Sequence, residues 1–250
     1  MERAGDADVA AAATLLAEPA RAKVLVALAD GRALPASLLA TEAGVSAQTI
    51  SAHLRKLLDG GLLTVETSGR HRYYRLAGPE VAAAVEAVAR IARPEPIKSL
   101  KQSTRAAALR EARTCYDHVA GRLGVALLEG LVRREALLRT DGCSGAARRP
   151  DDPLAQQLPD GPYELGPAAP EIFGELGVDL STGSPSRRLL RFCVDWSEQK
   201  HHLAGRLGAS LANALFDREW ITRRPRHRAI DLTPAGRAAL TDLKLLAEGN

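Results

Sequence analysis

The stretch GVSAQTISAHLRKLLDGGLLTVETSGRHRYYRL, from Gly44 to Leu76, decides the fold of this chain. It contains a tight turn, a helical segment, a Gly-Gly break and a basic hairpin pattern, which is the order of a winged helix. Ser46 is suited to begin the helix because its hydroxyl can accept an orphan amide proton of the first turn. The helix is expected to bury one apolar face, formed by Ile50, Leu54, Leu57 and Leu58.

The predicted hairpin joins residues 62–66 to residues 72–76 through Thr67-Ser68-Gly69. Residues 46–75 carry five Arg or Lys side chains against two acids, a local excess of the kind that neutralises phosphates. We therefore predict binding to double-stranded DNA; a helix–hairpin unit with solvated charges, or a winged helix that docks protein, is the alternative. The polar helix face and the basic hairpin offer DNA the side chains of Gln48, Thr49, Ser51, Arg55, Arg70, His71 and Arg72.

Over about residues 9–92 the chain resembles the ArsR/SmtB-type winged-helix transcriptional regulators. LLAEPARAKVLVALADG (Leu15–Gly31) is similar to the family's opening helix, VSAQTISAHLRKLLDGGLL to its recognition helix and GRHRYYRL to its wing. The resemblance implies a homodimeric repressor that leaves its operator when an inducer binds. It also implies that Ser46 and His53 face DNA, although His53 has an equal alternative as a packing or capping residue at the edge of the helix.

The metal-sensing signatures of that family are missing from the predicted winged helix. The segment before the turn, residues 34–44, has no Cys or His, and the helix predicted at residues 79–92 offers only Glu80 and Glu86 among Ala and Val. Two carboxylates without a His make a poor site for zinc or a softer metal. We expect this Ala/Val-rich helix to pack, against its symmetry mate in a homodimer.

The length of 250 residues predicts a second domain. Its boundary is expected at Arg93-Pro94-Glu95-Pro96, because prolines end a helix and favour an extended linker. The predicted domains are residues 1–93, which bind DNA, and residues 97–250, which sense or regulate. We find no signal peptide and no apolar run of membrane-spanning length. With three widely spaced Cys there is no disulfide framework, so a cytoplasmic protein without a membrane partner is predicted.

Two segments of the second domain resemble each other, Cys115–Leu137 and Cys193–Ile221. Both contain Cys-x-Asp, then His, then Ala-Gly-Arg-Leu-Gly and a helical Leu pattern, which indicates an internal duplication with repeats at about 97–180 and 181–250. Each repeat is predicted as two helices, a short strand or wing, and a closing helix that Thr233 and Pro234 begin in the second repeat. The expected fold class is therefore mainly α with small β-hairpins (α+β): a winged helix-turn-helix, then a helical domain of two winged-helix-like repeats.

The heads of the two repeats hold the candidate effector residues. In the first head the Cys, Asp and His are expected within one helical turn, and the second head forms a looser set. Three interpretations stay open: structural packing and capping, the lining of a small-molecule inducer pocket, or metal or redox sensing by Cys, His and carboxylate. The candidate residues are Cys115, Asp117, His118, Cys193, Asp195, Trp196, His201 and His202.

No enzyme is predicted, because the chain has no phosphate-binding glycine loop, nucleophile elbow, HExxH or CxxC. No cofactor is expected either. The favoured function is a homodimeric DNA-binding repressor released by an inducer, most simply a small molecule. The alternatives are a metal- or redox-sensing repressor that uses the repeat heads, and an architectural DNA-binding protein without an inducer.

Overall fold

The computed structural model describes residues 6–68, 71–93, 100–152, 158, 161–181, 187–224 and 228–247. The chain divides into two compact units, residues 1–85 and residues 86–250. The linker predicted at residues 93–96 lies mostly outside the described residues, so the domain limits 1–93 and 97–250 stay a prediction.

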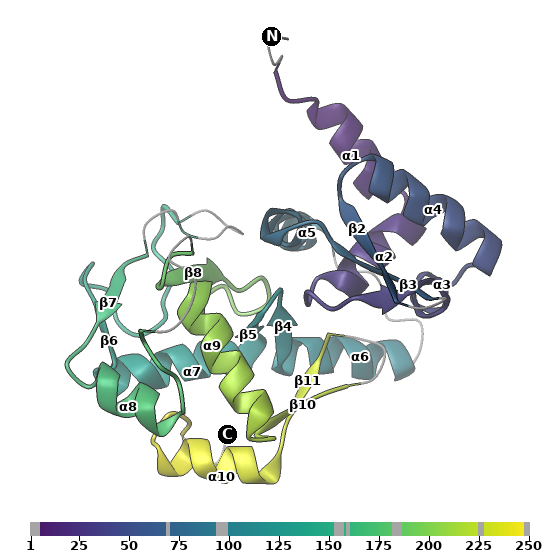
Figure 1. Cartoon of the computed structure of the whole chain (residues 1–250). Helices are drawn as coiled ribbons and strands as arrows, with labels where there is room; N and C mark the ends of the chain where they lie inside the picture. The colour runs from purple at the N-terminus through teal and green to yellow at the C-terminus, as the bar shows by residue number, and fades with distance from the viewer. Residues whose placement is uncertain are drawn as a thin grey trace. The chain divides into compact units, whose positions relative to one another are not determined.

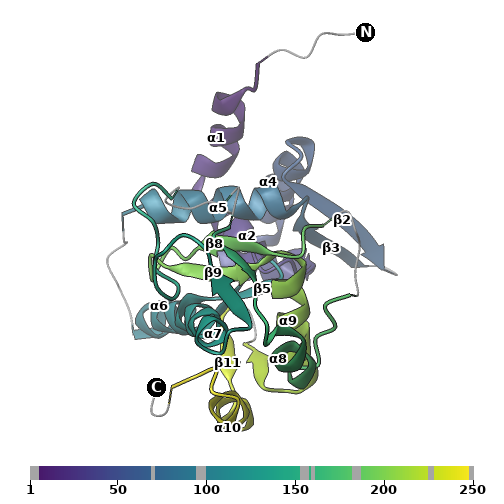
Figure 2. The ribbon, with the colours of Figure 1, turned by 90° about the vertical axis from the view of Figure 1, so that its left-hand side faces the viewer.

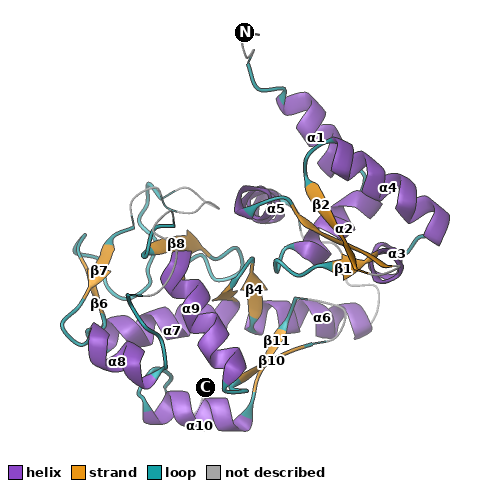
Figure 3. Ribbon diagram, viewed as in Figure 1, coloured by secondary structure: helices purple, strands orange, loops and turns teal. Residues whose placement is uncertain are grey.

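The N-terminal unit combines helices with one small antiparallel sheet of strand order β1-β3-β2 (Figure 1, Figure 3). A hairpin of β2 and β3 follows the helices, and the short β1 pairs with the other edge of β3. This is the winged helix that the sequence predicts, with β1 as an addition that the sequence did not indicate. The elements are α1 (Val9–Ala17), α2 (Pro19–Leu28), β1 (Leu34–Pro35), α3 (Ala36–Ala43), α4 (Ala47–Asp59), β2 (Leu63–Ser68) and β3 (His71–Leu76), and α5 (Pro79–Ile91) continues into the second unit.

The turn between α3 and α4 forms for the reasons expected. Gly44 ends α3 in the left-handed conformation at φ 73°, which a glycine adopts without strain. The Ser46 hydroxyl accepts a hydrogen bond from the Thr49 amide at 3.2 Å and caps α4. The predicted apolar face of α4 is buried at Ile50, Leu54 and Leu57, and Leu58 is half-buried.

In the second unit, helix α6 (Leu100–Glu111) follows α5, and the order hairpin, helix, hairpin, helix then occurs twice. Each hairpin is a two-stranded antiparallel sheet. The first series is β4 (Arg113–Cys115), β5 (His118–Ala120), α7 (Gly121–Arg133), β6 (Leu137–Arg139), β7 (Tyr163–Leu165) and α8 (Ala169–Glu175). The second is β8 (Arg191–Val194), β9 (His201–Ala204), α9 (Gly205–Asp217), β10 (Ile221–Arg223), β11 (Ile230–Leu232) and α10 (Pro234–Asp242).

The prediction of a mainly helical second unit is wrong at the repeat heads. Cys115, Asp117 and His118 do not share a helical turn; they lie on the β4–β5 hairpin, and Cys193 and His202 lie on β8 and β9. Strands of three or four residues are too short to show alternation in the sequence, and the helical pattern of the following segment obscured them. The end of the second series is as predicted, with Thr233 capping α10 and proline in its first turn.

The two head hairpins pack together in the middle of the second unit. Strands β5 and β9 contact each other, α7 packs against β9, and α9 packs against β5 (Figure 2). Each helix therefore contacts the hairpin of the other series, and one apolar core joins both series. Its largest fully buried apolar side chains include Phe173, Phe192, Leu128, Leu131 and Leu137.

The Ala-Gly-Arg-Leu-Gly segments begin α7 and α9, where their glycines allow close packing, as expected. A Cβ on Gly124 would lie 2.4 Å from the Val119 carbonyl oxygen and 3.6 Å from the His202 Cβ. A Cβ on Gly208 would lie 2.7 Å from the Leu203 carbonyl oxygen and 3.2 Å from the His118 Cβ. Each glycine thus lies close to the histidine of the other series, and the approach is tight at Gly208. Within the described residues, no helix combines the length and apolar character needed to span a bilayer.

Candidate functional site

The solvent-facing side of α4 carries the polar side chains predicted to meet DNA. Ser46, Gln48, Thr49, Ser51 and Arg55 are all exposed. The hydroxyl groups of the serines and the threonine are held locally: Ser51 donates to the Ala47 carbonyl at 2.9 Å, and the Ser46 and Thr49 hydroxyls lie 2.9 Å apart. The remaining exposed groups, an amide and a guanidinium, are long enough to reach base edges or phosphates.

His53 lies apart from this polar face. Its Nδ1 is 3.4 Å from a carboxylate oxygen of Glu18, the residue that caps α2, and the His53 side chain is only 16% exposed. This contact supports the alternative in which His53 packs at the edge of the recognition helix.

The β2–β3 wing presents two of the predicted basic side chains. His71 and Arg72 are exposed at the start of β3. Arg75, further along the strand, forms an ion pair with Glu66 at 2.5 Å, so part of the hairpin's charge is compensated. Arg70 was also predicted to contact DNA, and it lies outside the described residues.

In the second unit some of the head residues form a largely buried cluster, to which each hairpin contributes one Cys–His pair, with Cys193 partly exposed. Cys115 is the cross-strand partner of His118, and Cys193 is the partner of His202. The two imidazole rings stack with centroids 5.2 Å apart. The nearby Cys193 side chain, together with burial, raises the pKa of the Cys115 thiol.

Asp195 ties the two series together beside this cluster. Its Oδ2 accepts hydrogen bonds from Arg113 at 2.8 Å and from the Gly121 amide at 2.7 Å. Arg113 and Asp195 are both fully buried. Burial raises the pKa of Asp195, but the charges of Arg113 and His202 and the hydrogen bonds more than offset it, so this carboxyl is ionised with a pKa well below its usual range.

Asp117 is the corresponding carboxylate of the first hairpin. Its Oδ1 lies 3.3 Å from His118 Nδ1 and accepts from Arg187 Nη2 at 3.0 Å. Burial raises the pKa of Asp117, but the hydrogen bonds from these two partners lower it to about 2 overall. The carboxylate therefore stays charged next to His118.

The structure does not bring every candidate into the cluster. Both ring nitrogens of His201 are engaged elsewhere, Nδ1 with the Tyr163 hydroxyl at 2.9 Å and Nε2 with Asp152 at 2.6 Å. The Arg113 guanidinium lies over the Trp196 ring, with the Arg113 Cζ atom 4.7 Å from the ring centroid. These two residues thus support the fold around the cluster.

Sequence reasoning missed Arg113, Asp152 and Arg187, which hold the cluster's neighbours in place. Arg113 is a fully buried arginine two residues before Cys115, and no sequence pattern distinguishes it from the many solvated arginines of the chain. Asp152 and Arg187 come from loops whose spatial neighbours depend on the fold.

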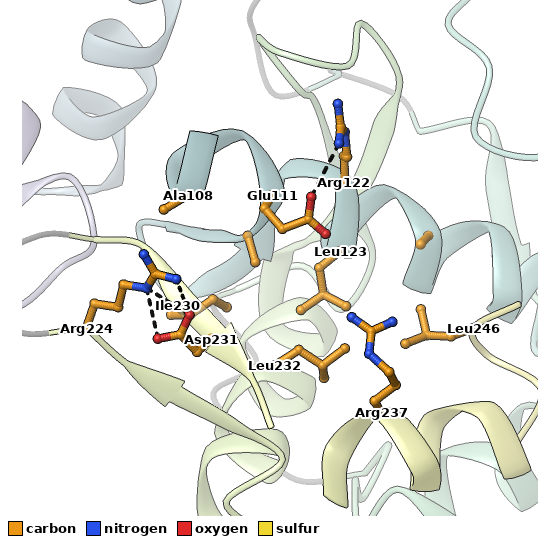
Figure 4. A pocket seen from close by; sticks show the side chains of 12 residues that line it. Ala108, Glu111, Arg122, Leu123, Arg224, Ile230, Asp231, Leu232, Arg237 and Leu246 are labelled. Atoms are coloured by element: carbon orange, nitrogen blue, oxygen red, sulfur yellow. Dashed lines mark hydrogen bonds and ion pairs between the residues drawn. The ribbon is translucent and has the colours of Figure 1, made fainter. Parts of the chain in front are cut away.

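A cavity of about 280 Å³ opens elsewhere in the second unit, between α6, α7, β11 and α10 (Figure 4). Its walls combine apolar groups such as Leu123 and Leu232 with Arg237, whose guanidinium points inward (Figure 4). At its rim Arg224 pairs with Asp231. The lining includes none of the predicted effector residues.

Comparisons with known proteins identify the chain. A family model described as a helix-turn-helix domain matches residues 16–66. The HTH-type transcriptional regulator YdfF of Bacillus subtilis is 39% identical over 233 residues, which cover 93% of this chain and 95% of YdfF. The chain belongs to the helix-turn-helix transcriptional regulators. The regulator predicted from the sequence is thereby confirmed, and its winged helix is the fold that the ArsR/SmtB resemblance implied.

Other relatives match a smaller part of the regulator. The HTH-type transcriptional regulator Rv0324 of Mycobacterium tuberculosis is 41% identical over 75 residues, 30% of this chain and 32% of Rv0324. A solved winged helix-turn-helix DNA-binding domain, Mb0332 of Mycobacterium bovis, is described as homodimeric and possibly of the ArsR family. It is 34% identical and covers 34% of this chain and 86% of its own, with a TM-score of 0.30.

Proposed function

We propose that this regulator is a homodimeric repressor whose α4 enters the DNA major groove while the wing contacts the flanking backbone. The proposal rests on the exposed surface of the N-terminal unit. Helix α4 buries its apolar face and exposes Gln48 and Arg55, and the wing exposes His71 and Arg72. Polar groups on a helix can read base edges, whereas basic groups on a hairpin supply backbone affinity.

Two helices expose apolar side chains to solvent in the single chain, and these surfaces support a dimer. Helix α1 has the sequence VAAAATLLA, yet none of its residues is buried. On α5, Val88 and Ile91 are 45% and 79% exposed. Symmetric dimers commonly bury such faces, and we infer that α1 and α5 contribute to the contact.

Signal reception is assigned to the second unit. The two series of hairpins and helices share Cys-x-Asp, His and Ala-Gly-Arg-Leu-Gly in the same order, which supports an internal duplication with a binding site where the copies meet. An inducer bound among the head residues would act by favouring a dimer geometry that misplaces the recognition helices. Such coupling is typically worth about 1–3 kcal/mol.

Genome-wide mapping of bound DNA, followed by anisotropy titrations with the recovered site, tests this function. We expect a two-fold symmetric sequence bound by one dimer and derepression of the adjacent genes when the protein is deleted. Light scattering that shows a persistent monomer with and without the site, or a deletion that lowers expression of those genes, would contradict the homodimeric repressor.

A further inference from the structure

We infer that Cys115, His118, Cys193 and His202 form a site for one zinc-like divalent cation at the junction of the two hairpins. The inference deepens the proposed function, because it names the class of ligand received by the second unit. It rests on that function only for the consequence at DNA; the binding itself concerns the second unit alone.

The backbone register places the four side chains together. Directly opposed residues of an antiparallel pair project from the same face of the sheet. Cys115 and His118 are such a pair, and so are Cys193 and His202. Stacking of His118 on His202 then brings the two pairs face to face. Two thiols and two imidazoles thereby converge from four strands.

The ligand atoms are close enough to share an ion. One atom each of Cys115, His118 and His202 lies within 4.8 Å of the other two. Bond lengths of about 2.3 Å for Zn–S and about 2.0–2.1 Å for Zn–N place tetrahedral ligand atoms about 3.3–3.8 Å apart. Small side-chain movements would bring these three ligand atoms to bonding distance, and Cys193, the cross-strand partner of His202, would supply the fourth ligand.

Unpaired nitrogen atoms point independently to a missing ligand. His118 and His202 are 5% and 1% exposed, and among the described residues Nε2 of each ring has no hydrogen-bond partner. Buried polar atoms without partners cost free energy and are uncommon in native proteins. A cation bonded to both nitrogens removes that cost.

The surroundings match those of metal-binding histidines, which usually have a carboxylate near their other ring nitrogen. Asp117 lies 3.3 Å from His118 Nδ1, and Asp195 lies 3.7 Å from His202 Nδ1. Each carboxylate is fixed by an arginine, Arg187 or Arg113. His118 Nδ1 is within hydrogen-bond distance of its carboxylate, whereas His202 Nδ1 is beyond that distance and has no hydrogen-bond partner among the described residues. Nε2 of each ring is open to the ion.

The donor set selects the metal. Two sulfur and two nitrogen ligands suit Zn²⁺ and related thiophilic ions, and lack the oxygen atoms preferred by Mg²⁺ or Ca²⁺. Four protein ligands leave no open position, which is typical of a non-catalytic site. On binding, each thiol releases its proton to solvent and coordinates as thiolate.

Metal titrations of the full-length protein under reducing conditions test the inference without DNA. Competition with a chromophoric chelator is expected to show one tightly bound Zn²⁺ per chain, and Co²⁺ should give the absorption of a tetrahedral thiolate complex. Cys115→Ser and Cys193→Ser are expected to weaken Zn²⁺ binding at least about 100-fold, since even outer-shell changes cost about 10–100-fold. Cys143→Ser, at an exposed cysteine outside the cluster, should bind Zn²⁺ like the wild type.

Circular dichroism shows whether a variant that has lost Zn²⁺ binding is still folded. Asp117→Asn is a milder variant, expected to weaken Zn²⁺ binding about 10–100-fold. A wild-type protein that fails to compete for Zn²⁺, or gives only an octahedral Co²⁺ spectrum, overturns the inference. So does a native protein whose mass is lower by two hydrogens because Cys115 and Cys193 form a disulfide. A protein that binds Zn²⁺ but no specific DNA would instead refute the proposed function and leave the metal site standing.

Discussion

His118 and His202 stack on each other with ring centroids 5.2 Å apart, although 83 residues separate them in the chain. Each histidine lies two residues before an Ala-Gly-Arg-Leu-Gly segment, and the second glycine of each segment lies against the histidine of the other series. The motif therefore contributes to the junction reciprocally, because the helix of each series lies against the histidine of the other.

Replacement of Gly208 by Ala should destabilise the second unit by about 1–3 kcal/mol, the usual range for overpacking. The new Cβ would meet the Leu203 carbonyl oxygen at 2.7 Å, and backbone cannot move aside easily. Gly124→Ala is expected to behave alike. Gly174→Ala is the control, since no atom lies within 4 Å of its added Cβ. If urea denaturation gives Gly208→Ala the same free energy of unfolding as Gly174→Ala, close packing at the motif does not contribute to stability.

The buried pair of Arg113 and Asp195 provides a second test. Asp195→Asn removes the charge that compensates Arg113, and loss of one partner of a buried pair costs about 3–5 kcal/mol. Adding Arg113→Met should recover part of that loss, because no uncompensated charge then remains. Removal of the exposed pair of Arg122 and Glu111 should cost at most about 1 kcal/mol. If chemical denaturation shows that Asp195→Asn lowers the free energy of unfolding no more than removal of the Arg122–Glu111 pair does, the structural role of Asp195 is refuted.

Acid sensitivity is expected at Asp141. Hydrogen bonds from the Arg139 guanidinium, at 2.6 and 3.0 Å, lower the pKa of Asp141 to about 2. In the unfolded chain an aspartate titrates near about 3.9, so ionised Asp141 stabilises the folded state fully above about pH 4, and this stabilisation is lost as the pH falls toward about 2.

Asp141→Asn should therefore lower the free energy of unfolding at pH 7, and its difference from the wild type should shrink below about pH 4. Asp242→Asn, at an exposed position near the end of α10, serves as the control. If the free energy of unfolding of Asp141→Asn differs from that of the wild type by the same amount from pH 7 to about pH 2, the ion pair is not the cause of the difference.

The winged helix could be predicted because its signals are local. Ser46 caps α4 through contacts within one turn, and the spacing of Ile50, Leu54 and Leu57 alone defines the buried face. The buried Cys–His cluster could not be predicted in the same way. The partnership of Cys193 with His202 depends on strand register across a hairpin loop, and the stacking of His118 on His202 depends on tertiary packing.

The similarity between Cys115–Leu137 and Cys193–Ile221 is nevertheless informative. The two segments contain Cys115, His118 and His202, which the structure brings close together, although the helical secondary structure predicted for these residues is wrong. His201 shows the limit of this reasoning: it neighbours His202 in the sequence, yet successive residues of a strand face opposite sides, and His201 contacts Tyr163 and Asp152 instead.

Separate changes on α4 and on the wing should affect DNA binding differently. Arg72→Ala is expected to weaken binding to all sequences and reduce the salt dependence by about one phosphate contact. Gln48→Ala should relax base preference at one position of each half-site, at a cost of about 1–3 kcal/mol for the preferred base. Arg133→Ala, in the second unit, is the control for loss of charge. If Gln48→Ala keeps both affinity and preference in anisotropy titrations, α4 does not read bases through this side chain.

Occupation of the proposed metal site should change operator affinity. Zn²⁺ can release DNA only if it binds the dimer geometry with misplaced recognition helices more tightly than the geometry that fits the operator. A coupling of about 1–3 kcal/mol corresponds to operator binding weakened by about 5- to 150-fold.

The measurement is an anisotropy titration of the operator at fixed Zn²⁺, compared with the same titration in chelator. Cys193→Ser should bind the operator equally in both conditions, whereas Cys143→Ser should respond like the wild type. A wild-type protein that holds Zn²⁺ at this site and binds its operator with unchanged affinity would make the ion a structural component and move the signal elsewhere.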